Sequence, residues 1–245
     1  MSKILVFNWK MNPSTLVEAE NLAQIISEHK NSDNQIVVCP SFVHLESLKN
    51  YQNSFTIGSQ EISTNIKGAF TGQISGNQLQ DLGAEFTLIG HSETRDKLTL
   101  TEINKKMLQA QNHKLTPILC IGYEKNPNKS ENIQINYPEL KEQIETALEC
   151  ISVPVWIAYE PVWAIGTGKI ASSQTIFEVL DFCQKVVVKI EPQSKLKLPH
   201  KFLYGGSVAP ENIAELAKIT SLDGFLVGGA SLVPDKLIQI LNFEK

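Results

Sequence analysis

Residues 103–122 read INKKMLQAQNHKLTPILCIG and contain the pattern that decides the fold. In the first half, Ile103, Met107 and Ala110 recur at helical spacing, which predicts an amphipathic helix. In the second half, residues 118–121 are apolar throughout. Short continuous runs of this kind are typical of strands that are buried on both faces of a parallel sheet. The stretch therefore predicts a helix followed directly by a buried strand.

The same alternation extends along the whole chain. Apolar, β-branched or aromatic runs predict eight strands, at Ile4–Lys10, Gln35–Pro40, Phe55–Gln60, Phe86–His91, Thr116–Gly122, Val155–Glu160, Phe202–Ser207 and Gly224–Gly229. Stripes with helical spacing lie at 16–26, 103–110, 140–148, 176–183, 213–217 and 237–241, and weaker ones at 41–51 and 73–82.

Eight strand–helix units in 245 residues, with no linker between them, predict an α/β fold of one domain over residues 1–245. This count favours a single (β/α)8 barrel with a parallel, closed, eight-stranded sheet. An open doubly wound sheet is the alternative. The lack of a GxGxxG motif after an early strand weakens the dinucleotide-binding form of that alternative.

The composition excludes several classes of protein. The chain has 22 Lys and Arg against 26 Asp and Glu, a net charge of -4, which is not the basic footprint of a nucleic-acid binder. The four cysteines form no CxxC pair, so a metal site is not expected. No apolar run is long enough for a membrane span, and Ile4–Phe7 is too short for a signal peptide. We therefore expect a cytoplasmic protein with neither nucleic-acid nor membrane partners.

Unusual residues stand at the predicted strand ends, where barrels of this kind place their active sites. Asn8 and Lys10 end the first strand, His91 the fourth and Glu160 the sixth, and Gly-Gly pairs end the seventh and eighth. Each has an ordinary structural explanation alone, but together they indicate a site. Glycines allow backbone N–H groups to approach an anion closely, so the pairs indicate a phosphate site. A small phosphorylated metabolite fits better than a nucleotide, since no Walker motif is present.

The segment after the sixth predicted strand reads EPVWAIGTGK over residues 160–169. Its middle is apolar although it lies between a strand and a helix. Pro161 precedes this middle, and Gly166 and Gly168 follow it. The pattern predicts a lid over Val162–Gly168 that excludes water from the chemistry. The alternative is a loop that is permanently packed on the barrel rim.

The chain resembles the triosephosphate isomerase family along its whole length. The matching segments are NWKMN (8–12), GAFTG (68–72), IGHSE (89–93), CIG (120–122), AYEPVWAIGTGK (158–169), YGGSV (204–208) and VGGASL (227–232). The resemblance implies interconversion of dihydroxyacetone phosphate and D-glyceraldehyde 3-phosphate, in glycolysis and gluconeogenesis. It also implies a homodimer that uses no cofactor.

By this resemblance, Glu160 is the base that moves the proton between the two carbons. His91 is the neutral electrophile, Lys10 and Asn8 stabilise the enediolate oxygens, and Glu93 is a supporting carboxylate near Lys10. The backbone groups that would hold the phosphate belong to Gly166, Ser207, Gly228 and Gly229.

The resemblance also implies that the segment 61–73 enters a pocket of the partner subunit. Thr71 of one subunit would there approach Asn8 and His91 of the other. The apolar tip Ala69-Phe70 otherwise has no obvious cover.

The sequence departs from the family pattern outside the catalytic set. Tyr123 stands where Glu is usual and Glu61 where Asn or Asp is common, and neutral Gln73 and Thr94 replace two charges that commonly pair across the dimer interface. Two other functions stay open. A different phosphate-binding barrel isomerase would not need Lys10, His91 and Glu160 together, and a non-catalytic binding protein would have a damaged catalytic set.

Overall fold

The computed structural model describes residues 2–30, 33–123, 135–164, 171–194 and 199–243. Eight parallel strands pair in chain order and close into a barrel, because β1 pairs with both β2 and β8. The strands are β1 (Ile4–Asn8), β2 (Gln35–Cys39), β3 (Thr56–Ser59), β4 (Phe86–Ile89), β5 (Thr116–Ile121), β6 (Trp156–Tyr159), β7 (Lys201–Tyr204) and β8 (Gly224–Val227). All eight predicted strands are confirmed, and each ends one to three residues earlier than predicted.

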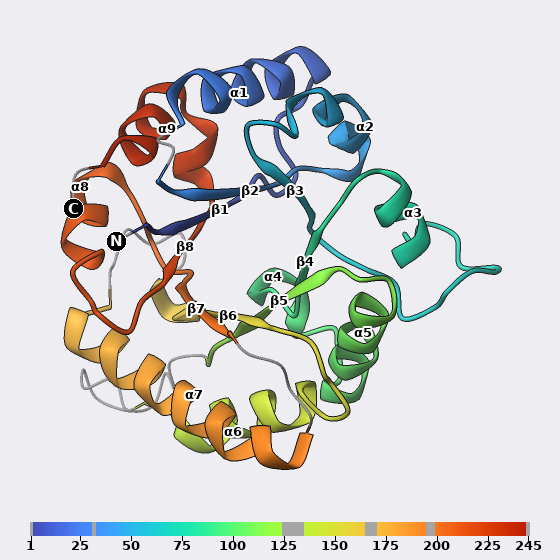
Figure 1. Cartoon of the computed structure of the whole chain (residues 1–245), viewed down its shortest axis with the longest axis vertical. Helices are drawn as coiled ribbons and strands as arrows, with labels where there is room; N and C mark the ends of the chain where they lie inside the picture. Colours follow the sequence, from blue (N-terminus) through green and yellow to red (C-terminus); the bar gives the residue numbers. More distant parts are fainter. Residues whose placement is uncertain (1, 31–32, 124–134, 165–170, 195–198, 244–245) are drawn as a thin grey trace.

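Helices surround this barrel and follow the strands around its circumference (Figure 1). The α-helices are α1 (Leu16–His29), α2 (Leu45–Leu48), α3 (Gly76–Asp81), α4 (Ser92–Arg95), α5 (Leu100–Asn112), α6 (Tyr137–Ala147), α7 (Ser173–Ser194), α8 (Pro210–Leu216) and α9 (Pro234–Leu241). Short 3-10 helices are η1 (Phe42–His44), η2 (Lys49–Tyr51), η3 (Val162–Ala164) and η4 (Gly229–Leu232).

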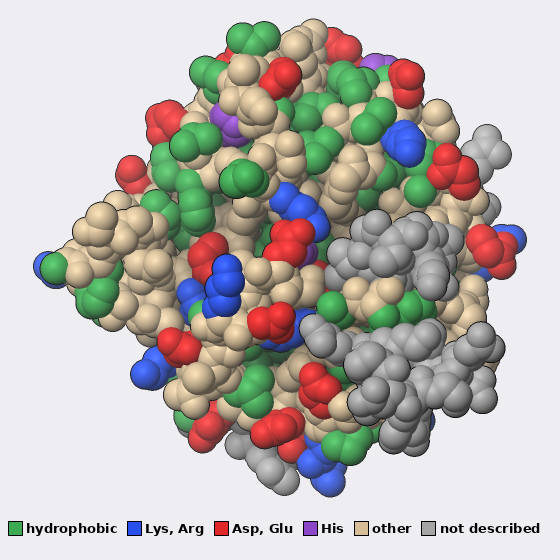
Figure 2. Space-filling model, turned by 180° about the vertical axis from the view of Figure 1, so that it is seen from behind, with side chains coloured by type: hydrophobic (Ala, Val, Ile, Leu, Met, Phe, Trp, Pro, Cys, Tyr) green, Lys and Arg blue, Asp and Glu red, His purple; other side chains and the backbone are tan. Residues whose placement is uncertain are grey.

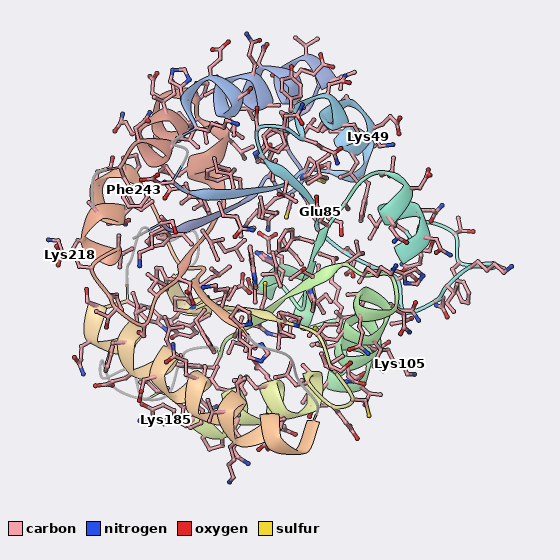
Figure 3. All side chains as sticks on the ribbon, in the orientation of Figure 1. Lys49, Glu85, Lys105, Lys185, Lys218 and Phe243 are labelled. Carbon is pink, nitrogen blue, oxygen red and sulfur yellow. The ribbon has the colours of Figure 1, made fainter. Side chains whose placement is uncertain are left out.

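Alternate residues of each strand contribute to two separate cores. Val6 and its register partners Val37 and Leu226 belong to a cluster inside the barrel. Leu5 and Phe7, the neighbours of Val6, belong to the larger cluster between strands and helices. Side chains fill the space within the ring of strands in Figure 3. The barrel interior is therefore packed, which leaves its C-terminal mouth for a ligand.

The helices begin where the local chemistry favours them. Thr15 caps α1 with a capping box to Glu18. Pro210 stands at the first turn of α8, where its fixed φ suits the start of a helix. One member of the predicted core stripe of α1 is wrong, because Leu16 is 46% exposed at the first turn of the helix. Within the described residues, no helix combines the length and the hydropathy that a membrane span requires.

The segment between β3 and α3 projects outward from the barrel (Figure 1). Glu61 holds its base, since its carboxylate lies 2.7 Å from Nζ of the buried Lys106, which also donates to the carbonyl of Ile62. Farther out, the side chains of Ile66 and Phe70 are 53% and 45% exposed. The start of this segment is thus anchored by an ion pair, and its apolar tip is exposed.

Candidate active site

Lys10 follows the end of β1 in a backbone conformation that non-glycine residues seldom adopt, with φ of 55°. Its N–H donates to Oδ1 of Asn8 at 3.0 Å. Its carbonyl accepts from Ser41 Oγ and Gln60 Nε2, at 2.9 and 2.8 Å. The loops after β2 and β3 therefore hold this residue in place. Its Nζ reaches Oε1 of Glu93 at 2.5 Å, so the expected proximity of these two charges is present.

His91 follows β4 and is the N-cap of α4. The backbone N–H of Glu93 donates to its Nδ1 at 3.2 Å, so the ring proton of the neutral form belongs on Nε2. Burial, together with Lys10 and Arg95, lowers the pKa of His91 to about 4, whereas Glu93 acts in the opposite direction. Burial is thus the main reason for a neutral ring.

Glu160 directly follows β6, and only 1% of it is exposed. Its Oε2 accepts the backbone N–H of Ser92 at 2.8 Å. Its Oε1 lies 3.1 Å from Nε2 of His91 but has no hydrogen-bond partner of good geometry among the described residues. Burial raises the pKa of Glu160 to about 7, against the lowering effects of Arg95, the Ser92 N–H and Lys10. A carboxylate in this environment is a stronger base than one in water.

Gly122 explains how Glu160 reaches this position. A Cβ atom at Gly122 would lie 2.0 Å from the carbonyl oxygen of Glu160, so no larger residue fits there without a shift. The Glu160 N–H donates to the carbonyl of Ile121 at 2.7 Å. The close approach of β5 and β6 at their ends therefore depends on glycine.

These side chains share one cavity of about 380 Å³ at the C-terminal ends of the strands. The cavity is lined by Asn8, Lys10, His91, Glu93, Glu160, Gly205, Gly206, Ser207, Val208, Leu226, Gly228, Gly229 and Ala230. Gly228 approaches the lysine so closely that a Cβ there would be 3.3 Å from Cε of Lys10. In Figure 2, basic, acidic and histidine side chains gather near the centre of one face of the molecule. A cation, a neutral imidazole and a buried carboxylate thus meet the two glycine pairs in one hollow.

The sequence profile of the family described as triosephosphate isomerase matches residues 3–244. The curated triosephosphate isomerase of Thermoanaerobacter pseudethanolicus is 36% identical over 247 residues, which cover 98% of each chain. That of Colwellia psychrerythraea is 38% identical over 257 residues, which cover 99% of this chain and 97% of the relative. This chain belongs to the triosephosphate isomerase family.

Two expected parts of the site, the lid and Thr71, are not among the described residues that line the cavity. Of the expected lid Val162–Gly168, the structure describes η3, and the rest, including Gly166, lies outside the described residues. Thr71 does not line the cavity of its own chain, because it belongs to the projecting segment between β3 and α3.

The departures from the family pattern have structural counterparts. Tyr123 is buried, and its ring stacks near that of Tyr159 with centroids 6.3 Å apart. A charged Glu at that position would therefore be buried beside an aromatic ring. Glu61 gains a cationic partner in Lys106, as described above.

Two contributors were missed by the sequence reasoning. The backbone N–H of Ser92 holds Glu160, and a backbone donor gives no signal in a list of side chains. Arg95 lies 3.6 Å from Oε2 of Glu160. A signal for it existed, because Arg95 follows His91 by four residues and is the only arginine in the chain.

Proposed function

We propose that this chain interconverts dihydroxyacetone phosphate and D-glyceraldehyde 3-phosphate by proton transfer through an enediolate. Glu160 removes the proton from the carbon next to the carbonyl, and the C–H electrons form the enediolate double bond. The electrons of the original carbonyl move onto its oxygen in this step. The same carboxyl group then returns the proton to the neighbouring carbon, while the enediolate's hydroxyl proton moves to the former carbonyl oxygen, so that the new carbonyl forms at the first carbon. Oε1 of Glu160 is suited to the transfer between the carbons, because that oxygen has no hydrogen bond of good geometry within the described structure.

The enediolate oxygens need donors that are already in position when negative charge develops. In this proposal Lys10 supplies an ammonium group, and His91 supplies its Nε2–H as a neutral donor. Asn8 lines the same cavity and donates to the same oxygens. Backbone N–H groups of Ser207, Gly228 and Gly229 hold the phosphate, together with Gly166. No metal or redox cofactor takes part in a step of this mechanism.

The observation that carries the proposal is the meeting of Lys10, His91 and Glu160 in one cavity with the glycine pairs. The test is turnover of glyceraldehyde 3-phosphate by the purified protein, in a coupled assay with no added metal. We expect rapid isomerisation that a chelator leaves unchanged. A protein that binds the substrate without converting it would contradict the proposal and favour a binding function.

The protonation state of His91 is a separate part of the proposal. Since burial lowers its pKa to about 4, we expect a neutral ring with the proton on Nε2 at pH 6. The measurement is 15N NMR of the histidine rings, with the signal assigned by its loss in His91→Gln. An imidazolium signature at pH 6 would exclude the electrophile role as stated.

The lid over Val162–Gly168 is also proposed. Its function would be to exclude water, which strengthens the donors and limits loss of phosphate from the enediolate. A deletion of four lid residues should reduce isomerisation and raise the fraction of substrate lost to elimination. An unchanged product ratio would indicate a loop that is simply packed on the rim.

We propose a homodimer in which the projecting segment inserts into the partner. Its support is the exposure of Ile66 and Phe70, and of Met11, which is 92% exposed. Exposed apolar groups of this kind are typical of interaction surfaces. Thr71 of one subunit would then complete the site of the other.

The test of the dimer is Thr71→Arg, which would place a charge in the pocket of the partner. We expect a weaker dimer and lower activity together, measured by sedimentation and by turnover. The matched control is Gln174→Arg on α7, away from the projecting segment (Figure 1). A fully active wild-type monomer at low micromolar concentration would contradict the proposal.

We propose a cytoplasmic location, which suits the exposed free thiol of Cys150. Cell fractionation is the direct test, and recovery of the protein outside the cytoplasm would refute this location.

A further inference from the structure

Arg95 is the only arginine among the 22 basic residues of the chain, all others being lysines. It is the last residue of α4 and its side chain is only 12% exposed. Arginine differs from lysine in two ways that matter when it is buried. It stays protonated in the poorly solvating interior of a protein, and its planar group offers five N–H donors at fixed angles. The one arginine thus occupies a place where both properties can be used.

The guanidinium group joins the ends of three neighbouring strands. Nη1 donates to the carbonyl of Gly90 after β4 at 3.0 Å and to the carbonyl of Cys120 in β5 at 3.3 Å. The same atom lies 3.6 Å from Oε2 of Glu160, which follows β6. Gly122 leaves room for the group, since a Cβ there would be 3.3 Å from Nη2. These polar contacts all use Nη1, so what a lysine would lack here is the second nitrogen beside Gly122.

Oε2 of Glu160 therefore faces two donors from one short segment, the N–H of Ser92 and the side chain of Arg95. We propose that Arg95 is a positioning residue that keeps Glu160 ionised and holds its Oε2 beside Ser92, so that Oε1 stays available for the proton. This inference rests on the proposed function of Glu160 as the base. It adds a residue that does not line the substrate cavity and acts through Glu160.

The electrostatic balance at Glu160 supports this assignment. Burial raises its pKa, and Arg95 is the largest of the influences that lower it. The other groups that face the carboxylate are Lys10, which follows β1 and lowers the pKa less, and His91, which is neutral. Cys120 on β5 is buried and its thiol pKa is raised, so it contributes no charge near neutral pH. Arg95 is thus the main counter-charge of the candidate base.

The first test is the pH dependence of kcat/KM, whose acid limb reports ionisation of the base in the free enzyme. Arg95→Gln keeps a hydrogen-bond donor and removes the charge. We expect the acid limb to move to higher pH by about one unit or more, the usual effect of losing an opposite charge at this distance. Arg95→Lys should return the limb toward its wild-type position. A merely structural role would lower activity at every pH and leave the limb in place.

Lys97→Gln is the matched control, because it removes one exposed positive charge two residues further along the chain. We expect its acid limb to coincide with that of the wild type. A limb of Arg95→Gln that also coincides with the wild type would overturn the proposal.

The second test needs no change of Arg95. Labelling with 13C,15N-arginine gives one guanidinium signal, because the chain has one arginine. We expect this signal to shift with pH as Glu160 ionises, and the shift to vanish in Glu160→Gln. A signal that does not titrate between pH 5 and 9, or one that titrates unchanged in Glu160→Gln, would refute the assignment. The experiment requires no turnover, so its outcome is independent of whether the proposed isomerase activity is found.

Discussion

The carboxylates of Asp223, at the N-terminal end of the barrel, and Glu160, at the C-terminal end, lie in contrasting environments. Asp223 accepts the N–H of Phe202 on Oδ2 at 2.9 Å, and its Oδ1 lies 3.0 Å from Nζ of Lys201. Glu160 is buried, has one firm donor, and has one oxygen without a hydrogen bond of good geometry among the described residues. The first arrangement stabilises the fold, whereas the second keeps a group reactive, as is usual at these two ends of such barrels.

The backbone at Lys10 is also strained, although positive φ is not confined to this end, since Lys114 and Cys150 before β5 and β6 share it. Lys10, at the C-terminal end, has a positive φ and depends on contacts from two other loops. Such strain persists only where the surrounding structure imposes it, and it is common at active sites. The comparison therefore predicts that changes at Glu160 alter activity and that changes at Asp223 alter stability.

The largest expected effect is on turnover. Glu160→Gln keeps the shape of the side chain and removes the base, so we expect a loss of about 10²–10⁴-fold or more, measured by the coupled assay. Glu142→Gln, on an exposed position of α6, is the control and should retain wild-type turnover. Near wild-type activity in Glu160→Gln would assign the base to another residue.

The second prediction is that Glu160→Gln, which lowers turnover, raises the stability of the protein at high pH. The folded-state pKa of Glu160 is raised to about 7 by burial, above its unfolded value. The folded protein then holds an extra proton between about pH 4 and pH 7, so wild-type stability falls as the pH rises through this window. Glu160→Gln avoids this loss and should be more stable than the wild type by about 3 kcal/mol at pH 8, but not at pH 4.

The measurement for this prediction is urea unfolding of both proteins at pH 4 and pH 8. A variant that is equally stable or less stable at pH 8 would show that the folded protein tolerates the charge of Glu160 without loss. The contrast between the two barrel ends would then not extend to stability.

The third prediction concerns the opposite end. Asp223→Ala leaves the N–H of Phe202 without its acceptor, which should lower the free energy of unfolding by about 1–3 kcal/mol. Turnover at 25 °C should stay at the wild-type level, because Asp223 is not among the cavity-lining residues. A loss of activity in the folded variant would contradict the separation of roles between the ends.

The sequence predicted the barrel well because strand and helix periods are local properties. Residues 118–121 are a buried strand and Ile103, Met107 and Ala110 are buried on α5, as their spacing indicated. The strand ends also placed Lys10, His91 and Glu160 at one face, and they do share a cavity. That part of the site follows from topology alone.

Other parts of the site could not be predicted, because they depend on distances between separate segments. The approach of Arg95 to Glu160 joins residues 65 positions apart in sequence, and the Ser92 donor is a backbone group. The misplacement of Leu16 has a similar cause, because a first-turn position can face solvent or core depending on how the helix is entered. Periodicity describes a helix but not the tertiary contacts at its ends.

The smallest expected effect separates the two partners of Asp223. The side chains of Lys201 and Asp223 are 36% and 29% exposed, so their ion pair is solvated and should contribute only about 0–1 kcal/mol. Lys201→Met should therefore change the free energy of unfolding far less than Asp223→Ala does, since the Phe202 N–H keeps its acceptor. In the Asp223→Ala background the same change should have no further effect. Urea unfolding of the four proteins of this double-mutant cycle measures the coupling between the two side chains. A coupling as large as the whole effect of Asp223→Ala would show that the ion pair, and not the backbone acceptor, stabilises this end of the barrel.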